Sequence, residues 1–419
     1  MKIGFFINLH LHNSFNLNKF SHPWLLLQNS LSLLKQIFRI QIYVRKLYII
    51  FSLSLVCNLN TAFLLAQSSD SMSSWSLSAY ADVYYAKYSD EVSVGNFQQF
   101  ASISPRNNSF GLNVLQISSQ YDGPNFRAAA TLHYGDVPSS SWSQNYNAIQ
   151  EAHVGVRILK TLWLDAGFFK THFGTEYLMP KDNIASSLAM ISYYEPFYES
   201  GVRLNFDPTK NLEINLFLLN GYNMFIDNNN TKSFGMGITY LLGDKGNIGY
   251  TDYIGDDAPP GSSLPHTRFA NNLFLNYNFS RKLTVQAGGD FFVQQNSDLF
   301  NLTKPGIAYG ALGTLKYQVK SRFAVYERTD FFYDGEGILS PAYTYPNGNQ
   351  LGYTSVSQTT GVEYKPSENS YIRVEYRRIN MLNNEDIFIT NHRNVDYRND
   401  LMVNMGVNFD LLKGSQNKK

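Results

Sequence analysis

The chain has 419 residues, 44% of them hydrophobic and 16% charged, and it carries 29 Tyr and 30 Phe against a single cysteine, Cys57. This composition is that of a folded protein with an excess of aromatic residues. One cysteine excludes an internal disulfide bond, and Cys57 lies in a segment that we expect to be removed. A thiol enzyme and a cysteine-ligated metal site are therefore excluded as well.

The first 66 residues differ in charge from the rest of the chain. They contain six Lys or Arg and no Asp or Glu, whereas residues 67–419 carry 28 basic and 33 acidic side chains, a formal charge of −5. This negative charge argues against nucleic acid as a partner. Arg45 and Lys46 precede an apolar run from Leu47 to Ala66, and polar residues follow it.

This order of charge, apolar core and small residue predicts a secretory signal peptide at 44–66, cleaved after Ala66. Residues 1–43 are then interpreted as a mis-assigned extension upstream of the true start. A membrane-anchoring helix is the alternative, because the apolar run is just long enough to span a bilayer. Asn58 and Asn60 in the middle of the run count against that alternative.

Beyond residue 74, apolar and polar residues alternate, which is typical of strands with one apolar face. In KLTVQAGGDFFVQ, for example, Leu283, Val285 and Val293 share one face, and Thr284 and Gln286 lie on the other. The sixteen predicted strands are 75–89, 108–120, 124–136, 148–159, 162–171, 198–207, 211–222, 232–242, 246–255, 267–280, 282–294, 306–319, 322–334, 353–365, 369–382 and 395–411.

The connections between these strands alternate between short and long. The short ones are rich in turn residues or charge, as in DGP (122–124) and GDKG (243–246). The long ones are 90–107, 137–147, 172–197, 223–231, 256–266, 295–305, 335–352 and 383–394. Short turns at one end, long loops at the other and an even strand count are the architecture of outer-membrane barrels.

The predicted fold is therefore all-β: a single transmembrane, antiparallel, up-and-down barrel of about 16 strands over residues 67–419, with short periplasmic turns and long extracellular loops. Lipid covers the apolar face, and closure leaves no unpaired strand edge in hydrocarbon. Aromatic girdles would account for the Tyr and Phe excess, with Trp75, Tyr84, Tyr121, Trp163, Phe206, Tyr240, Tyr277, Phe279 and Phe409 as candidates. A secreted β-sandwich or β-solenoid is the alternative, but it gives no reason for the alternating loop lengths.

Charged residues recur on the face of the strands that would line the lumen. The predicted pore-lining residues are Glu151, His153, Arg157, Asp165, Glu199, Arg203, Glu327, Arg328, Asp330, Arg373, Glu375 and Arg377. Glu327 shares the phase of Phe323 and Val325, so its inclusion requires a β-bulge. One interpretation of these charges is that a water-filled interior tolerates them without any selectivity for solutes. The more specific interpretation is that opposing rows of acidic and basic residues screen solutes by charge and dipole.

The third long loop, 172–197, exceeds the length of a simple connection, and loops of this size are usually functional or disordered. Asp182 or Asn183 could cap a short helix through IASSLAMIS. We expect the loop to fold into the barrel and narrow the pore, with Lys181, Asp182 and Glu195 near the constriction. An ordered external lid is the alternative.

No enzyme constellation stands out. The five histidines of the mature chain, His133, His153, His172, His266 and His392, lack metal-ligand spacing, and no GxSxG nucleophile motif is present. The sequence therefore predicts no enzymatic activity, no cofactor and no metal. A barrel hydrolase with a serine near His153 or His133 stays open, because such triads need not be close in sequence.

The run LWLDAGFFKTHFGTE, followed by DNIASSLAMISYYEPFYESGVRLNF, resembles the putative β-barrel porin 2 (OmpL-like) family of outer-membrane proteins. Members show a similar Gly-Xaa-Phe at a strand end, a Gly-Xaa-Glu shortly after, and a Tyr-Glu-Ser-Gly at the next strand start, here Tyr198 to Gly201. AYADVYYAKY and LNGY, Leu219 to Tyr222, are also similar. The resemblance covers nearly all of the mature chain, with its core at 162–223, and implies a porin-like barrel without naming a substrate or site residues.

One departure from barrels of this kind is the tail DLLKGSQNKK after Phe409, since such proteins typically end near a terminal aromatic that the assembly machinery reads. Phe409 is the candidate assembly signal. The predicted function is passive diffusion of small hydrophilic solutes across the outer membrane of a Gram-negative bacterium; the alternative is a non-conducting barrel that binds or adheres through its external loops. Expected partners are outer-membrane lipid, the barrel assembly machinery, the solutes and, by analogy of fold, further copies of the chain.

Overall fold

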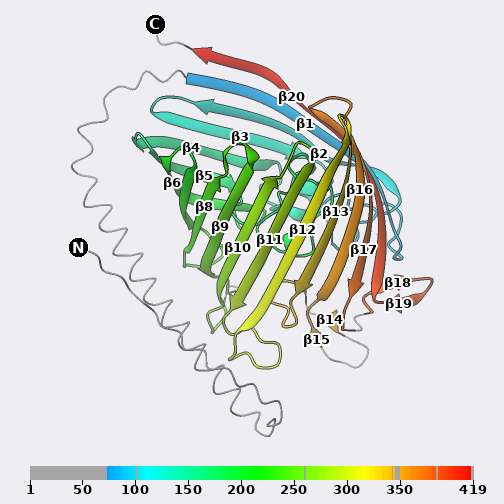
Figure 1. Cartoon of the computed structure of the whole chain (residues 1–419). Coiled ribbons are helices and arrows are strands. Elements are labelled where there is room, and N and C mark those ends of the chain that lie inside the picture. The colour runs from blue at the N-terminus through cyan, green and yellow to red at the C-terminus, as the bar shows by residue number, and fades with distance from the viewer. Residues whose placement is uncertain are drawn as a thin grey trace, which may run out of the picture. The chain divides into compact units, whose positions relative to one another are not determined.

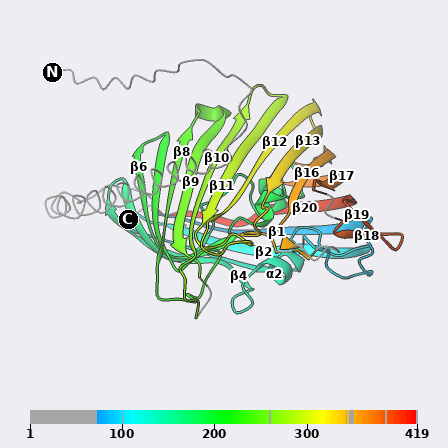
Figure 2. The same ribbon diagram turned by 90° about the horizontal axis from the view of Figure 1, so that it is seen from below.

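The computed structural model describes residues 73–416, except 101, 259–260, 342, 345–349 and 384–385. Within these residues, sixteen strands form one antiparallel sheet that closes on itself (Figures 1 and 2). Each barrel strand pairs with the next one along the chain, and the first, β1, pairs with the last, β20. The predicted closed barrel is confirmed, whereas the proposed extension at 1–43 and signal peptide at 44–66 lie outside the described residues.

Every predicted strand overlaps one observed strand of the barrel. The barrel strands are β1 (Ser73–Tyr88), β2 (Ser109–Asp122), β3 (Phe126–Tyr134), β4 (Ile149–Leu159), β5 (Leu162–Lys170), β6 (Tyr198–Thr209), β7 (Leu212–Leu219), β8 (Ser233–Leu241), β9 (Gly246–Asp256), β10 (Thr267–Asn278), β11 (Leu283–Gln294), β12 (Gly306–Lys320), β13 (Phe323–Tyr333), β16 (Thr354–Tyr364), β17 (Ser370–Met381) and β20 (Tyr397–Gln416). The last strand extends beyond its predicted end at 411, because its final residues pair with the start of β1.

The connections divide as predicted, with short turns at one end of the barrel and long loops at the other (Figure 1). The short turns include one 3-10 helix, η3 (Gly243–Lys245). The long loops hold the α-helix α2 (Asp136–Ser141), the 3-10 helices η1 (Pro180–Asp182) and η2 (Ile191–Tyr193), and two small hairpins, β14 (Tyr343–Thr344) with β15 (Gln350–Leu351) and β18 (Phe388–Thr390) with β19 (Arg393–Val395). Among the described residues, no helix is long and apolar enough to cross a membrane.

The outer face of the barrel is apolar. On β20, Leu401, Val403 and Met405 are exposed, while Met402 and Asn404 between them are buried on the inner face. Exposed aromatic side chains lie near both ends of the strands: Phe126, Phe206, Tyr240, Phe279, Tyr317, Phe323, Tyr364 and Phe409 toward the short turns, and Phe110, Tyr134, Phe234, Phe291 and Tyr309 toward the long loops. This distribution is that of an apolar band with two aromatic girdles.

Two residues expected in the girdles lie inside the barrel instead. Tyr84 and Trp163 are buried, at 3% and 8% exposure. Each shares the phase of an inward-facing carboxylate, Asp82 on β1 and Asp165 on β5, and alternate residues of a strand point to the same face. The prediction from residue type alone therefore placed both residues on the wrong face of the barrel wall.

Candidate functional site

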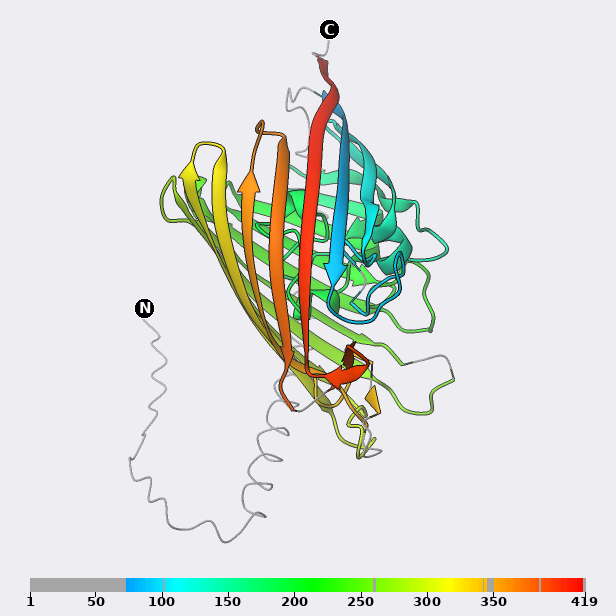
Figure 3. The same ribbon diagram turned by 90° about the vertical axis from the view of Figure 1, so that its right-hand side faces the viewer.

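The third loop (172–197) runs inside the barrel, against the inner face of β10–β13, β16 and β17 (Figure 3). Glycines on the wall allow this close approach. A Cβ built on Gly288 would lie 1.8 Å from the hydroxyl of Thr175, and one on Gly310 would lie 2.7 Å from the Cβ of Ile191. The wall is therefore shaped to accept the loop, which agrees with the expectation that the loop folds inward.

The middle of the loop is held by carboxylates that accept hydrogen bonds from its backbone. The amides of Ser186 and Ser187 both donate to Glu375 on β17. The amide of Ala189 donates to Glu176 Oε2 (2.7 Å), and that of Met190 donates to Asp330 Oδ1 on β13 (2.9 Å). Buried amides must find acceptors, and here they are supplied by two carboxylates on the wall, Glu375 and Asp330, and by one in the loop itself, Glu176.

These bonds explain why the predicted helix through IASSLAMIS does not form. An α-helix would use the same amides to bond carbonyls one turn back. Only two 3-10 turns, η1 and η2, are present in the third loop. Asn183 caps neither turn as an N-cap; its amide group instead bonds the backbone N–H and C=O of Tyr177.

Arg328 on β13 is the centre of this attachment. Its side chain is completely buried. One Nη donates to Glu176 Oε1 (2.8 Å) and to the carbonyl of Ser187 (2.5 Å), and the other donates to the hydroxyls of Ser187 (3.0 Å) and Thr359 (3.2 Å). Charge-assisted, multiply bonded contacts of this kind are the strong ones, so Arg328 ties both halves of the loop to the wall.

A second attachment lies nearer the short-turn end. Arg373 on β17 pairs with Glu363 on β16 at 2.8 Å. Its remaining donors reach the carbonyls of Pro180 (2.8 Å) and Asn183 (3.0 Å) in the third loop. The η1 turn, which carries Lys181 and Asp182, is thereby held at a defined place in the lumen.

The start of the loop is fastened by His172. Its Nδ1 lies 2.8 Å from Glu199 Oε1, and its Nε2 lies 2.8 Å from the carbonyl oxygen of Asp252. Both ring nitrogens face acceptors, so the doubly protonated ring satisfies both. Burial opposes the charge, but Glu199 and the two hydrogen bonds raise the pKa of His172 overall. Gly235 leaves room for the ring, since a Cβ there would lie 2.6 Å from it.

The end of the loop carries a buried carboxyl group. Glu195 lies beside Asp290 on β11 and close to Gly174, whose φ of +106° suits glycine. Burial, together with the charges of Asp290 and Glu176, raises the pKa of Glu195 well above its ordinary value. With 5% exposure, Glu195 lies between loop and wall rather than at an opening, contrary to its predicted position near the constriction.

The free side of the loop faces the wall formed by β4–β7. Tyr177 is 54% exposed, and the carboxylates of Asp182 and of Glu213 on β7 act on its hydroxyl electrostatically. Burial lowers the pKa of Lys181, and the charges of Lys170 and Glu151 act on it from the wall. Lys181 is partly exposed and Asp182 is exposed on this side of the loop, and Lys181 Nζ lies 4.9 Å from the ring centre of Tyr80 on β1.

The opposite wall pairs its charges. Arg127 and Arg203 both bond Asp165, with Nε to carboxylate oxygen distances of 2.7 and 3.0 Å. Lys170 Nζ lies 3.1 Å from Glu151 Oε1, and His153 lies beside the same carboxylate at 3.8 Å. Arg157 stacks over Trp163, 4.6 Å from the ring centre. This wall therefore carries both signs of charge in close alternation.

Eleven of the twelve residues predicted to line the pore point inward, and they divide into two groups. Glu151, His153, Arg157, Asp165 and Arg203 lie on the inner face opposite the loop. Glu199, Arg328, Asp330, Arg373, Glu375 and Arg377 also point inward, but each is at most 3% exposed and lies beneath or beside the loop. The structure thus places the second group where it holds the loop.

Glu327 is a correction, because it points outward. The strand β13 keeps an unbroken register with β16 from Phe323 to Tyr333, so the expected bulge is absent there. Glu327 shares the outer face with Phe323 and Val325, and Leu315 and Thr360 lie opposite it on the neighbouring strands. The alternation of the strand was the correct signal, and the bulge invoked to bring the charge inward was wrong.

Several buried polar residues were not singled out in the sequence. Glu176 and Glu363 bond Arg328 and Arg373, as described above. The first long loop (89–108) also folds into the mouth of the barrel, where Phe100 and Ile103 are buried and Arg398 of β20 donates to Gln98. A signal existed only for Glu176, which is the last residue of the Gly-Xaa-Glu motif beginning at Gly174.

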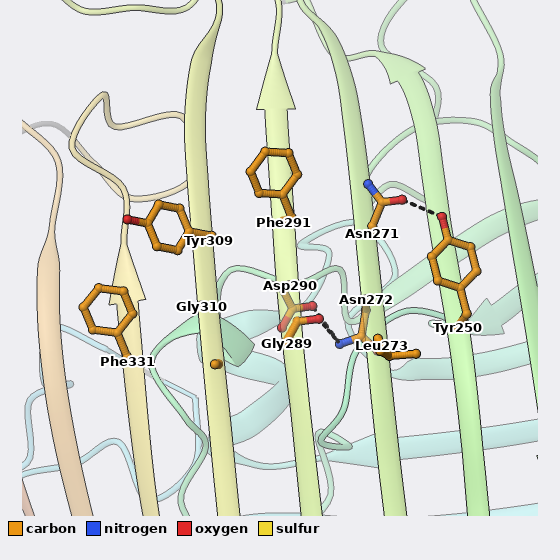
Figure 4. A pocket seen from close by; sticks show the side chains of 11 residues that line it. Tyr250, Asn271, Asn272, Leu273, Gly289, Asp290, Phe291, Tyr309, Gly310 and Phe331 are labelled. Atoms are coloured by element: carbon orange, nitrogen blue, oxygen red, sulfur yellow. Dashed lines mark hydrogen bonds between the residues drawn. The ribbon is translucent and has the colours of Figure 1, made fainter. Parts of the chain in front are cut away.

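A hollow of about 500 Å³ lies on the outer face over Gly289 (Figure 4). Phe291, Tyr309 and Phe331 border it, while Asp290 and Asn272 on the same strands are buried toward the lumen. Its rim is apolar and aromatic, which suits hydrocarbon rather than a hydrophilic solute. Within the described residues, no group of three or more His, Cys, Asp or Glu side chains is placed to hold a metal ion.

Comparison with known proteins gives one family and a set of similar structures. The sequence model of the family described as putative beta-barrel porin-2, OmpL-like, matches residues 74–409. No curated protein matches the chain at a significant level. The structure is similar to the outer membrane channel DcaP of Acinetobacter baumannii, with a TM-score of 0.56 and 10% identity over 82% of this chain and 99% of that one.

Two further solved structures are similar at the same level. The anion-selective porin from Comamonas acidovorans has a TM-score of 0.52 and 9% identity over 80% of this chain and 100% of that one. OmpF of Salmonella typhi, in a complex with daunomycin, has a TM-score of 0.51 and 10% identity over 80% and 97%. At these identities the similarity concerns the fold alone.

Proposed function

The chain belongs to the putative β-barrel porin-2, OmpL-like, family, and on that premise we propose that it is an outer-membrane channel for passive diffusion of small hydrophilic solutes. The observation that carries the proposal is that the middle of the third loop is attached to one side of the barrel. The loop is bonded to β13 and β17, whereas exposed polar side chains, including Glu213 on β7 and Lys170 on β5, remain on the opposite inner wall. A polar passage between the two is what a diffusion channel requires.

The third loop is the proposed constriction, and Lys181 and Asp182 are its proposed charged residues. They lie on the free side of the loop and interact electrostatically with Lys170 on the wall. Glu151, His153, Arg157, Asp165 and Arg203 form the proposed opposite lining. Closely alternating charge across a narrow passage would favour small dipolar or charged solutes over apolar ones.

The proposed location is the outer membrane of a Gram-negative bacterium, with lipid against the apolar outer face. The aromatic girdles support this location, because they are the usual feature of barrel surfaces at the two membrane interfaces. Phe409 is the proposed assembly signal; it lies on the outer face of β20 at 42% exposure, paired with Ala79. No catalytic role is proposed, since His133 packs edge-on against Trp142 and His153 lies beside Glu151.

A second function, a barrel that does not conduct and acts through its long loops, is favoured by one observation. The first loop and the third loop contact each other inside the mouth, where Phe100 lies 6.0 Å from Tyr193, ring centre to ring centre. If the two loops together close the passage, the remaining functional surface is the external one, with its hairpins β14–β15 and β18–β19.

Single-channel conductance in planar bilayers separates the two functions. The purified mature chain, residues 67–419, should give steady steps of nanosiemens order, and deletion of residues 176–194 should increase the step size because the constriction is removed. Resistance to unfolding in unheated detergent verifies that each barrel is folded. No conductance from either folded form would reject the channel and favour the external-loop function.

A further inference from the structure

A hollow of about 460 Å³ lies in the lumen at the short-turn end, and its charged lining is mostly cationic. Lys181 comes from the third loop, and Lys316 and Arg373 come from β12 and β17. Arg281 and Lys282 come from the β10–β11 turn, and Lys365 from the β16–β17 turn. Segments far apart in the sequence thus bring six cations to one place.

Within the described residues, one carboxylate lines this hollow and one further carboxylate forms ion pairs with its cations. Asp182 lines the hollow next to Lys181. Glu363 lies behind the lining, where it bonds Lys316 at 2.5 Å and Arg373 at 2.8 Å. Six cations against two carboxylates leave an excess of four positive charges by formal count.

The cations of the two turns are the least compensated. Within the described residues, Arg281, Lys282 and Lys365 form no ion pair with any carboxylate. The opposite wall differs, since Arg127 and Arg203 there are both paired with Asp165. Positive charge is therefore a property of this hollow and not of the lumen in general.

Neutral amide side chains complete the lining: Asn183, Asn247, Asn276, Gln286 and Gln318. Four of them already donate within the protein: Asn183 to the carbonyl of Tyr177, Asn276 to Asn247, Gln286 to the carbonyl of Thr175 and Gln318 to that of Lys320. The donors offered to a solute are therefore mainly the lysine ammonium and arginine guanidinium groups, which bind oxyanions.

From this arrangement we propose that the short-turn end of the lumen is a binding site for small polyanionic solutes, those with two or more phosphate or carboxylate groups. The inference rests on the proposed channel function, which supplies the route by which a solute reaches the hollow. Lys181 and Arg373, which anchors the η1 turn, connect the hollow to the proposed constriction. A sphere of this volume is about 10 Å across, close to the Debye length at physiological salt, so the six cations act together on a bound solute.

Side-specific block of the channel tests the site. Inorganic pyrophosphate, added at millimolar concentration on the side of the short turns, should reduce the potassium chloride current more strongly than the same addition on the other side. The orientation of the inserted channel is assigned from the side on which an added protease cuts the long loops. Glucose, which is neutral, should give no side-dependent block.

The variant Arg281→Gln, Lys282→Gln, Lys365→Gln removes the unpaired cations, all of which lie in turns or just beyond a strand end, so the barrel should fold. It should raise the half-blocking concentration of pyrophosphate at least tenfold. The matched control is Lys160→Gln, Lys210→Gln, Lys245→Gln, which removes three exposed lysines from other short turns that do not line the hollow. Pyrophosphate should block this control variant at the same concentration as the wild type.

Equal block in the two triple variants, or equal block from both sides, would overturn the proposed site. If the folded barrel does not conduct, pyrophosphate binding to the detergent-solubilised wild type and to the same two variants is measured by titration calorimetry. Binding that is lost only in the first variant would support the site while rejecting the channel. Absence of binding to the wild type would overturn the site independently.

Discussion

Replacement of Arg328 by methionine should release the third loop. Methionine keeps an unbranched side chain in the same space but removes all four hydrogen bonds to Glu176, Ser187 and Thr359. It also leaves Glu176 buried without its cation, and it leaves Asp330 with Arg377 alone, 3.8 Å away. Removing one partner of a buried ion pair costs about 3–5 kcal/mol, because the remaining charge is uncompensated.

This free energy acts on the equilibrium between the docked loop and an undocked one. Since about 1.4 kcal/mol corresponds to a factor of ten, the docked fraction relative to the undocked one should fall by at least about a hundredfold. The backbone pairing of β13 with β12 and β16 does not depend on the Arg328 side chain, so the barrel itself should stay folded. The expected result is a mobile loop in an intact barrel.

Two measurements read the position of the loop. Lys181 is the only Lys or Arg in residues 172–197, so tryptic cleavage of the folded barrel at this residue reports an undocked loop. Single-channel recordings should show larger and noisier steps than in the wild type. The matched control is Arg157→Met, because Arg157 also faces the lumen but stacks on Trp163 and does not bond the loop.

Wild-type conductance together with resistance at Lys181 in folded Arg328→Met would refute the reasoning. The loop would then be held by Glu375 and Arg373, and Arg328 would contribute little. Equal cleavage in Arg328→Met and Arg157→Met would show that any lost lumen arginine loosens the barrel. In that case the effect would not be specific to the attachment of the loop.

Because the pKa of His172 is raised, its contribution to stability should be complete below about pH 6.5, the ordinary pKa, and should be lost as pH rises through the raised value. Denaturant midpoints measured against pH should show this loss in the wild type and not in His172→Gln. Identical pH profiles for the two proteins would contradict the prediction. Glu327→Leu should stabilise the barrel by roughly 1–2 kcal/mol, since a charged side chain is costly on the lipid-facing surface. The control is Glu213→Leu, which changes a carboxylate in the lumen. A loss of stability in Glu327→Leu would indicate that Glu327 has a polar partner, such as a second copy of the chain. Phe409→Ala should lower the amount of assembled barrel in cells without affecting refolding in detergent. The control variant Phe323→Ala, at a residue of similar exposure, should assemble normally. Equal assembly defects in the two variants would exclude a signalling role of Phe409.

Much of the barrel was predictable from the sequence because the alternation that identifies a strand involves only residues close together in the chain. Alternate residues of a strand face opposite sides, so the pattern in Leu401 to Val407 is sufficient to identify a strand and its apolar face. The lengths of the connections then separated the two ends of the barrel. Glu327 shows how dependable this signal is, since it faces outward as its phase indicates.

The interior was decided by contacts between distant segments. Arg328 and Glu176 are 152 residues apart, and Ser186 and Glu375 are 189 apart, so no local pattern relates them. Local propensity was misleading for IASSLAMIS, where wall carboxylates take the amides that a helix would use. The unpaired cations of the short-turn hollow likewise meet only after closure of the barrel.

The sequence by itself therefore determined the strands, their faces, the closed barrel and the family. Only the tertiary structure decided which inward-facing charges hold the third loop and which remain free to meet a solute. The physical reason is that the face of a strand residue depends on its immediate neighbours, whereas the pairing of a buried charge depends on whichever segments the closed barrel brings within hydrogen-bond distance.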